Sequence, residues 1–443
     1  MSARKVSRRA FLKAAGLGAA GVALAACQPQ TKAVEAEQIE ISMRHDPNEK
    51  FRQGYADAAA EFQEIHPNIT IVFDDSAAPQ GGYIPWMAAG TAPDMFRTAI
   101  NEGPSFGLTG MVHDVAPHCE KLDIIDKFIP AIWDGFKYKD SVYSVPNDAN
   151  TLLLWSNPVL YEEAGVADLL PPKTWDDVVK VCEAVTVKDP DPTKAVFGYA
   201  IPTTIGWSGF FFWFWLWRFG GDFVTDDTYE ILFDSPECRE ALEALRFLVA
   251  EEYLPAIDNW DTPFFNGRCA SYEYGSWAVP RDVPGEWNDF TPKGPWTADY
   301  EQPNFVLSEQ VQLKEGVPNY SVFAGFSQFL PRLTNLHPQE TVEWIWYTLT
   351  TDPYGSMWLR IGNQLLCTTV YSDPWLEEPA WAVFMKQLET TKPLGRNPAQ
   401  LQFDGECVNP NFMKAWLGEM EIEEAIAKAV ECAEPICEEY RNL

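Results

Sequence analysis

Few side chains in this sequence form a pattern that points to catalysis or metal binding. His113, Asp114, His118 and Cys119 are a dense group of metal-binding residue types, but their spacing matches no zinc motif. We expect a solvated helix end there and no metal site. The motifs G-x-S-x-G, H-E-x-x-H and G-x-x-x-x-G-K are absent. The sequence therefore predicts no catalytic residue, although its 64 acidic side chains would allow the carboxylate pair of a glycoside hydrolase.

The clearest chemical assignment concerns Cys27, near the amino end. The segment from Ser7 to Lys13 is basic and contains an arginine pair, and residues 14–26 are uncharged. This order is typical of an export signal, and the uncharged run is too short to span a membrane. The arginine pair resembles a twin-arginine signal, and the residues from Leu24 to Cys27 resemble the lipobox of bacterial lipoproteins. We expect residues 1–26 to be removed.

Two interpretations of Cys27 stay open. In the first, the cysteine becomes the mature amino terminus and carries the lipid chains that anchor the protein to a membrane. In the second, it is a small apolar residue beside an ordinary cleavage site. A match to the dinucleotide-binding motif G-x-G-x-x-G, from Gly16 to Gly21, lies inside the removed segment and has no strand before it, so we expect no cofactor.

The charge balance excludes several partners. The chain has 33 basic and 64 acidic residues, a formal charge of −31, and the export signal itself carries only basic charges. Nucleic acids and anionic lipid surfaces are therefore not expected as partners. The 18 tryptophans and 14% aromatic residues indicate either an aromatic core or a binding surface that uses flat rings.

Eight cysteines follow Cys27, an even number that permits disulfides outside the cytoplasm without fixing their pairing. Cys182 lies on the apolar stripe of a predicted helix, so we expect a buried thiol. Cys432 and Cys437 are five positions apart in another predicted helix, where their side chains point away from each other.

Periodic apolar residues predict an α/β fold. Residues 39–43 alternate as in a strand, residues 51–65 follow helical spacing, and residues 69–73 alternate again. A strand, a helix and a strand in this order form a parallel crossover. The roughly 417 residues after the signal exceed what one core usually serves, so we expect at least two domains.

Three further helices are expected. A capping box at Thr174 to Asp177 starts a helix that ends near Val185. Residues 342–349 and 422–433 carry apolar stripes. Nine aromatic rings lie between Trp207 and Phe219, a segment that we interpret as a buried helix whose first one or two rings reach a cleft.

Several motifs together resemble one protein family. They are Gly90 to Phe96, Tyr143 to Pro146, Asn157 to Gly165, Pro171 to Trp175, and Phe265 to Ala270 followed by Gly275-Ser276-Trp277. In this order they resemble the family 1 extracellular solute-binding proteins of ABC importers, the maltose-binding-like group. The resemblance covers essentially the whole chain after the signal.

This resemblance implies an α/β, two-lobed, periplasmic-binding-protein-like fold, in which each lobe is a sheet flanked by helices and crossing segments form the hinge. Residues 27–38 would be a lipid-anchored tether. The first lobe would comprise residues 39–148 and about 325–372, and the second residues 149–324 and about 373–443. Crossings are expected near residues 148–152, near 321–327 and past 370.

The resemblance also implies a function. The protein would capture a mono- or oligosaccharide between the lobes and deliver it to an ABC permease, as an exported monomer anchored by its lipid or held in the periplasm. Carried over by position, the expected ligand contacts are Arg44, His45, Asp46, Asn101, Glu102, Asp148, Asn150, Trp207, Phe210, Trp277 and Phe326. Amide and carboxylate groups would pair with sugar hydroxyls, and aromatic rings would cover the C–H face.

The chain departs from the family pattern at Asn157-Pro158 and at Ser271-Tyr272. Arg396 is a further candidate contact near the carboxyl end. Two alternatives stay open: a secreted glycoside hydrolase, and the same fold with a solute that is not a sugar. Trp277 is either a stacking platform or a core residue.

Overall fold

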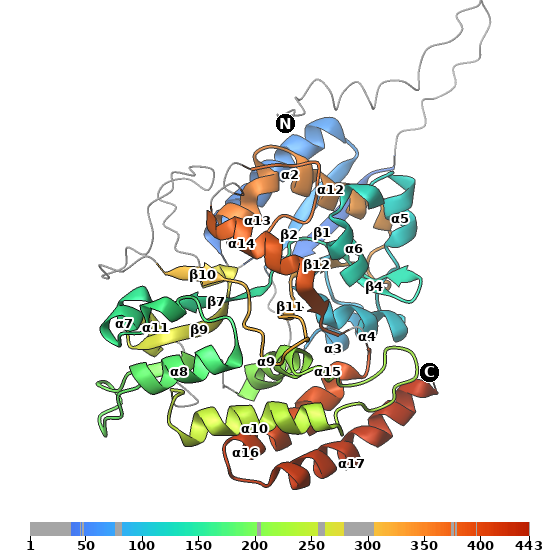
Figure 1. Ribbon diagram of the computed structural model, residues 1–443. Helices are drawn as coiled ribbons and strands as arrows, with labels where there is room; N and C mark the ends of the chain where they lie inside the picture. Colours follow the sequence, from blue (N-terminus) through green and yellow to red (C-terminus); the bar gives the residue numbers. More distant parts are fainter. Residues whose placement is uncertain are drawn as a thin grey trace, which may run out of the picture.

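The computed structural model describes residues 37–442, apart from residues 45, 47, 76–81, 202–204, 256–261, 279–304, 374–375, 377–378 and 396. Its elements form two lobes of sheets and helices, one above the other in Figure 1. The α/β, two-lobed fold predicted from the sequence is therefore confirmed. Among the described residues, no helix has both the length and the apolar character needed to cross a membrane.

The first lobe begins with the predicted parallel crossover. β1 (Ile39–Arg44) and β2 (Ile69–Asp74) pair in parallel and are connected by α2 (Glu49–Ile65). The helix begins where the side chain of Asn48 accepts a hydrogen bond from the Lys50 N–H. Its apolar face is buried in the core of this lobe.

A second sheet in this lobe joins distant parts of the chain. β12 (Phe326–Phe329) lies between β3 (Phe96–Ala99) and β6 (Val145–Pro146) and is antiparallel to both. The remaining helices and strands of the lobe are α3 (Tyr83–Ala88), α4 (Gly103–Leu108), α5 (Ala116–Lys121), α6 (Pro130–Gly135), β4 (Lys137–Tyr138), β5 (Ser141–Val142), α12 (Pro338–Thr350) and α13 (Met357–Arg360).

The second lobe is built on a sheet of the order β10-β7-β9-β8. β7 (Leu152–Ser156) is antiparallel to β9 (Cys269–Gly275) and to β10 (Val306–Ser308), and β8 (Phe197–Ala200) is parallel to β9. The other elements are α7 (Pro158–Glu163), α8 (Trp175–Val185), α9 (Ile205–Arg218), α10 (Pro236–Ala250), α11 (Thr262–Phe265), β11 (Ser321–Phe323), α14 (Pro379–Gln387), β13 (Thr391–Pro393), α15 (Gln400–Phe403), α16 (Asn409–Trp416) and α17 (Ile422–Arg441).

The local expectations for these helices are confirmed. Thr174 accepts a hydrogen bond from the Asp177 N–H, and the Asp177 carboxylate accepts one from the Thr174 N–H, which completes the capping box of α8. In α9 the side chains of residues 212–217 are all buried. Cys182 is a buried thiol, as expected.

A buried ion pair lies between α9 and β9. The Arg218 guanidinium donates to the Glu273 carboxylate at 2.7 Å, and both side chains are fully buried. Glu273 also accepts hydrogen bonds from the Tyr199 hydroxyl at 2.5 Å and from the Trp215 indole N–H at 2.9 Å. This network fixes the aromatic helix against the sheet.

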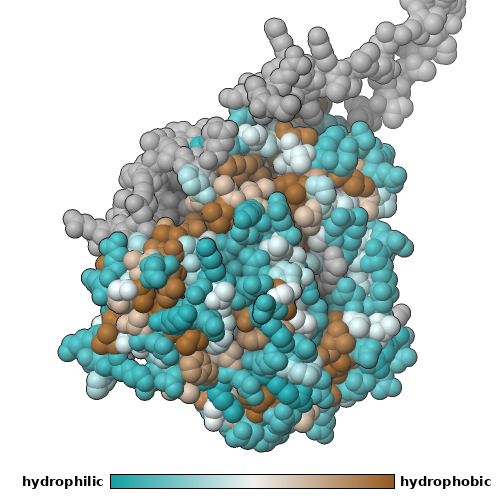
Figure 2. Space-filling view, in the orientation of Figure 1, coloured by the Kyte–Doolittle hydropathy of each residue, from teal (hydrophilic) through white to brown (hydrophobic). Residues whose placement is uncertain are grey.

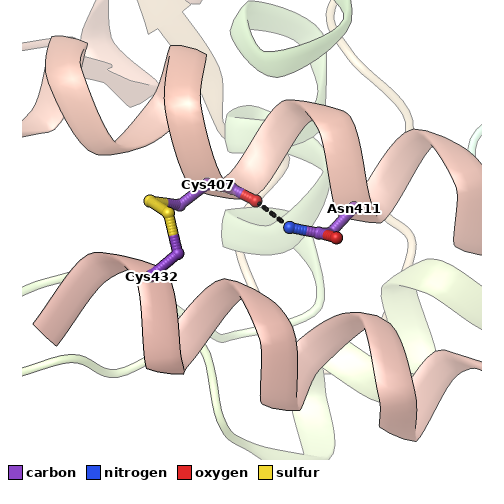
Figure 3. Close-up of a disulfide and its surroundings, with 3 residues drawn as sticks. All are labelled: Cys407, Asn411 and Cys432. Atoms are coloured by element: carbon purple, nitrogen blue, oxygen red, sulfur yellow. Dashed lines mark hydrogen bonds between the residues drawn. A yellow bond between two sulfur atoms is a disulfide. The ribbon is translucent and has the colours of Figure 1, made fainter.

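One disulfide connects the last helices of the chain. Cys407 bonds to Cys432 of α17, with their Cα atoms 5.5 Å apart (Figure 3). The Asn411 side chain donates to the Cys407 carbonyl at 2.7 Å in the same region. Cys437 is a thiol rather than the partner of Cys432, in agreement with the helical spacing.

Three chain segments meet where the lobes join, and we call their residues 148–151, 324–326 and 363–365 the crossing cluster. Asn150 forms an antiparallel bridge with Ala324, and Ala149 forms another with Leu365. Away from this cluster, the hydroxyls of Tyr138 in the first lobe and Tyr229 in the second lie 2.9 Å apart and are buried. The face of the molecule seen in Figure 2 is mostly hydrophilic, with apolar residues in separate patches.

Candidate functional site

Asn150 holds the crossing cluster together. Its side-chain oxygen accepts hydrogen bonds from the Ser276 N–H at 3.3 Å and from the Ser276 hydroxyl at 3.0 Å. Its amide nitrogen donates to the Gln364 side-chain oxygen at 2.6 Å. The residue is only 3% exposed, so the structure places it inside the junction of the lobes with both polar groups engaged.

Asp148 is fully buried beside it and forms an ion pair with Arg97 of β3. The Arg97 guanidinium donates to the carboxylate at 2.6 Å. The same carboxylate accepts hydrogen bonds from the Asn147 side chain at 3.2 Å and from the Phe326 N–H at 3.2 Å. Burial raises the pKa of Asp148, and Arg97 counteracts this rise by favouring the charged form.

Phe326 is the last residue of the second crossing segment and the first of β12, and it is 37% exposed. The guanidinium carbon of Arg97 lies 3.9 Å from the centre of the Phe326 ring and 3.5 Å from that of the Trp358 ring. Trp358 stacks in turn on Phe51 of α2 at a centroid distance of 4.0 Å. The exposed ring of Phe326 therefore forms the end of a stack that begins in the core.

Trp277 lies in the second lobe, next to the crossing cluster, and packs against the core of that lobe. It follows Ser276, the partner of Asn150, and its ring is partly buried. The ring lies over the backbone of Gly275, where a Cβ atom would come within 2.1 Å of it, and it meets Tyr274 edge-on at 5.0 Å. The Trp277 ring can occupy this position because residue 275 is a glycine and has no Cβ atom.

Arg44 ends β1 and contacts two aromatic side chains of α3. It donates to the Tyr83 hydroxyl at 3.2 Å, and its guanidinium carbon lies 5.9 Å from the Trp86 ring centre. Asp46 accepts a hydrogen bond from the Asn48 N–H at 2.8 Å, at the start of α2. His45 lies outside the described residues.

Asn101 and Glu102 follow β3 in a single helical turn, and both are partly exposed. Gly395 of the carboxyl-terminal region packs directly on Asn101, since a Cβ atom at position 395 would come within 2.6 Å of the Asn101 backbone. Burial raises the pKa of the Glu102 carboxyl group. These two residues therefore lie where the lobes approach each other.

Other expected contacts are not described. The side chains of Trp207 and Phe210, as well as Arg396 and Cys27, lie outside the described part of the chain. Within that part, no group of three or more side chains could hold a metal ion. His113 instead contacts the Asn335 carbonyl at 3.0 Å, and His118 contacts Gln339 at 3.2 Å.

Sequence reasoning missed Arg97, Tyr83, Trp358 and Gln364 as parts of this site. A signal for Arg97 was present, because a lone arginine stands in a short strand of otherwise uncharged residues, where an isolated charge needs a specific partner. No comparable signal marked the other three. Their roles come from contacts between segments far apart in the sequence.

The site combines partly exposed rings from both lobes with amide, carboxyl and guanidinium groups. Phe326 and Trp277 offer flat apolar surface, and Asn101, Glu102 and Arg44 offer hydrogen-bonding groups. Such a set suits a ligand with apolar faces and many hydroxyls.

The chain matches a known protein family and is similar to a maltotriose-binding protein. Residues 47–303 match the family model described as bacterial extracellular solute-binding protein. The maltotriose-binding protein of Pyrococcus abyssi is 25% identical over 254 residues. The match covers 56% of this chain and 52% of the relative, so the chain spans about half the length of the relative that it matches.

Solved structures share the fold over nearly the whole chain. An ABC transporter solute-binding protein from Thermotoga lettingae, bound with alpha-D-tagatose, superposes with a TM-score of 0.69 at 18% identity, covering 90% of this chain and 99% of that one. The cyclic alpha-maltosyl-1,6-maltose binding protein from Arthrobacter globiformis gives a TM-score of 0.70 at 20% identity, covering 90% and 98%. At these identities the likeness establishes the fold alone.

Proposed function

Because this chain belongs to the bacterial extracellular solute-binding proteins, we propose that it captures a carbohydrate between its two lobes and delivers it to the permease of an ABC importer. The observation that carries the proposal is the pair of partly exposed rings, Phe326 in the first lobe and Trp277 in the second, both at or next to the crossing cluster. A ring from each lobe can cover the C–H face of a sugar as the lobes close. The maltotriose-binding relative supports the same class of ligand.

We propose distinct roles for the expected contact residues. Phe326 and Trp277 stack on the sugar, and Arg44, Asn101 and Glu102 hydrogen-bond to its hydroxyls. Asp148 and Asn150 are buried, and their role is to fix the crossing cluster from which the rings project. The proposed lobe boundaries near residues 148, 324 and 372 are compatible with this division, since the crossing cluster lies at the first two of them.

The lobes would close over the ligand by motion about the crossing cluster, without making or breaking a covalent bond.

The test is a thermal-shift screen with maltotriose, mannobiose and tagatose. A ligand that binds only the folded state at a hundredfold excess over Kd stabilises it by about 2.7 kcal/mol. Binding with intact recovery of the sugar supports the proposal. Hydrolysis of the sugar would favour the glycoside hydrolase, and stabilisation by none of the three would contradict a carbohydrate of these types.

The lipid anchor is a separate proposal, supported by the sequence from Leu24 to Cys27. The protein would be a monomer held at the outer face of the membrane by lipid on Cys27. Cys27→Ala should release the protein from the membrane fraction or leave its signal uncleaved. A Cys27→Ala variant that fractionates and migrates like the wild type would refute lipidation.

A further inference from the structure

Arg97 contacts two of the three crossing segments and a tryptophan that precedes the third. Its guanidinium is bonded to Asp148 in the first crossing segment and lies against Phe326, which ends the second. It also lies against Trp358, a few residues before the third segment begins at position 363. One side chain from β3 thus links the first two crossing segments to Trp358, which precedes the third.

Besides its ion pair with Asp148, the guanidinium contacts two aromatic rings. The centres of the Phe326 and Trp358 rings lie 3.9 Å and 3.5 Å from its central carbon, distances that are typical of close cation–π stacking. Its Nε atom is buried and has no hydrogen-bond partner among the described residues. An N–H on the edge of the guanidinium donates to Asp148, and its flat faces contact the Phe326 and Trp358 rings. A lysine could keep the charge but could not stack in this way.

The backbone of Phe326 is fixed by the same pair. Asp148 accepts the Phe326 N–H at 3.2 Å while it binds Arg97, so both the main chain and the ring of Phe326 depend on this unit. Gly325 lies so close to Asp148 that a Cβ atom would come within 2.5 Å of the Asp148 carbonyl oxygen. The ring therefore has little freedom to move independently of the crossing cluster.

We propose that Arg97 is the positioning residue for Phe326: stacked between Trp358 and Phe326 and bonded to Asp148, it sets the angle at which the Phe326 ring meets the ligand. This inference rests on the proposed function for its ligand, a carbohydrate, but the stack itself is independent of the ligand. Arg97 does not contact the sugar in this role. It acts through the ring.

A ligand-free experiment tests the positioning. Hydrogen exchange of the peptide spanning residues 323–327 is compared between wild type, Arg97→Met and Arg97→Lys. We expect about tenfold faster exchange in both variants, since neither can stack on the two rings. Arg360→Lys is the matched control, because Arg360 also pairs with a buried aspartate, Asp373, at 2.6 Å. Unchanged exchange in both Arg97 variants would overturn the proposal.

A double-mutant cycle tests whether Arg97 acts through the ring. Maltotriose affinity is measured for Arg97→Met, Phe326→Leu and the double variant, after each is shown to melt cooperatively. We expect Arg97→Met alone to weaken binding about tenfold, or ~1.4 kcal/mol, and to have little further effect when Phe326 is already leucine. Additive losses would show that Arg97 acts elsewhere and would refute the proposal. If wild type binds none of the three sugars, the proposed function fails, while the exchange experiment still decides the role of Arg97.

Discussion

Gly275→Ala offers a sharp test of the role of Trp277, because it moves the ring without removing it. A Cβ atom at position 275 would lie 2.1 Å from the Trp277 ring, whereas ordinary van der Waals contact begins at 3.4 Å. The ring must therefore shift by about 1.3 Å, the difference between these two distances. Because the nearest atoms belong to a partly exposed side chain and not to the backbone, we expect the ring to move rather than the strand.

We expect Gly275→Ala to weaken ligand binding rather than to lower the free energy of unfolding. One face of a pyranose ring hides on the order of 60 Å² of apolar surface, which at about 25 cal/mol per Å² corresponds to ~1.5 kcal/mol. A gap of 0.5–1 Å already removes about a quarter to a half of a dispersion contact, so a shift of this size removes most of it. We expect maltotriose to bind about tenfold more weakly to Gly275→Ala. The free energy of unfolding should change by less than about 1 kcal/mol.

The assay measures maltotriose affinity by calorimetry and stability by urea unfolding on the same samples. Gly405→Ala is the control, because a Cβ atom at position 405 would meet no atom within 4 Å and the backbone there has no positive φ. It should change neither quantity. If Trp277 is a core residue, Gly275→Ala overpacks the core and costs about 1–3 kcal/mol of stability with unchanged affinity. That result would refute the stacking role.

Three further experiments address the fold and the site. Glu273→Leu should cost about 3–5 kcal/mol of unfolding free energy in urea, because it leaves the charge of Arg218 buried without its partner; a loss below about 1 kcal/mol would contradict this. Replacing both Cys407 and Cys432 by alanine should cost about 3 kcal/mol for a loop of this length, and a reducing agent should destabilise the wild type but not the variant. Since burial raises the folded-state pKa of Glu102, its protonated form favours folding below the unfolded-state pKa, and this contribution is lost as the pH rises through the folded-state value. Glu102→Gln should thus raise the unfolding free energy at pH 7 and lose that advantage near pH 4; an equal effect at both pH values would argue against a raised pKa.

The local elements of the fold follow from short-range patterns. Alternating apolar residues predicted β1 and β2, and helical spacing predicted α2 between them. The capping box of α8 was readable because its two partners, Thr174 and Asp177, are only three residues apart. Interactions within one turn or strand depend little on the rest of the chain, so the sequence alone reveals them.

The candidate site was predictable only in part. Asp148 and Asn150 were expected as ligand contacts at the first crossing, but nothing in the sequence indicated that both are buried within the protein. Their contacts explain why: Asn150 bonds to Gln364, 214 residues away, and Asp148 bonds to Arg97, 51 residues away. Whether a polar side chain faces a ligand or a distant partner depends on which segments the fold brings beside it.

The sequence by itself determined the acidic character, the α/β pattern and the family resemblance, and it predicts the export segment. Each of these properties depends only on residues close together in the sequence or on the overall composition. Only the tertiary structure decided that Arg97 stacks between Phe326 and Trp358, that Cys407 pairs with Cys432, and that Gly275 makes room for the Trp277 ring. The physical reason is that stacking, disulfide formation and close packing require atoms within a few ångströms, and for most of these pairs the chain reaches such proximity only after its distant segments have folded together.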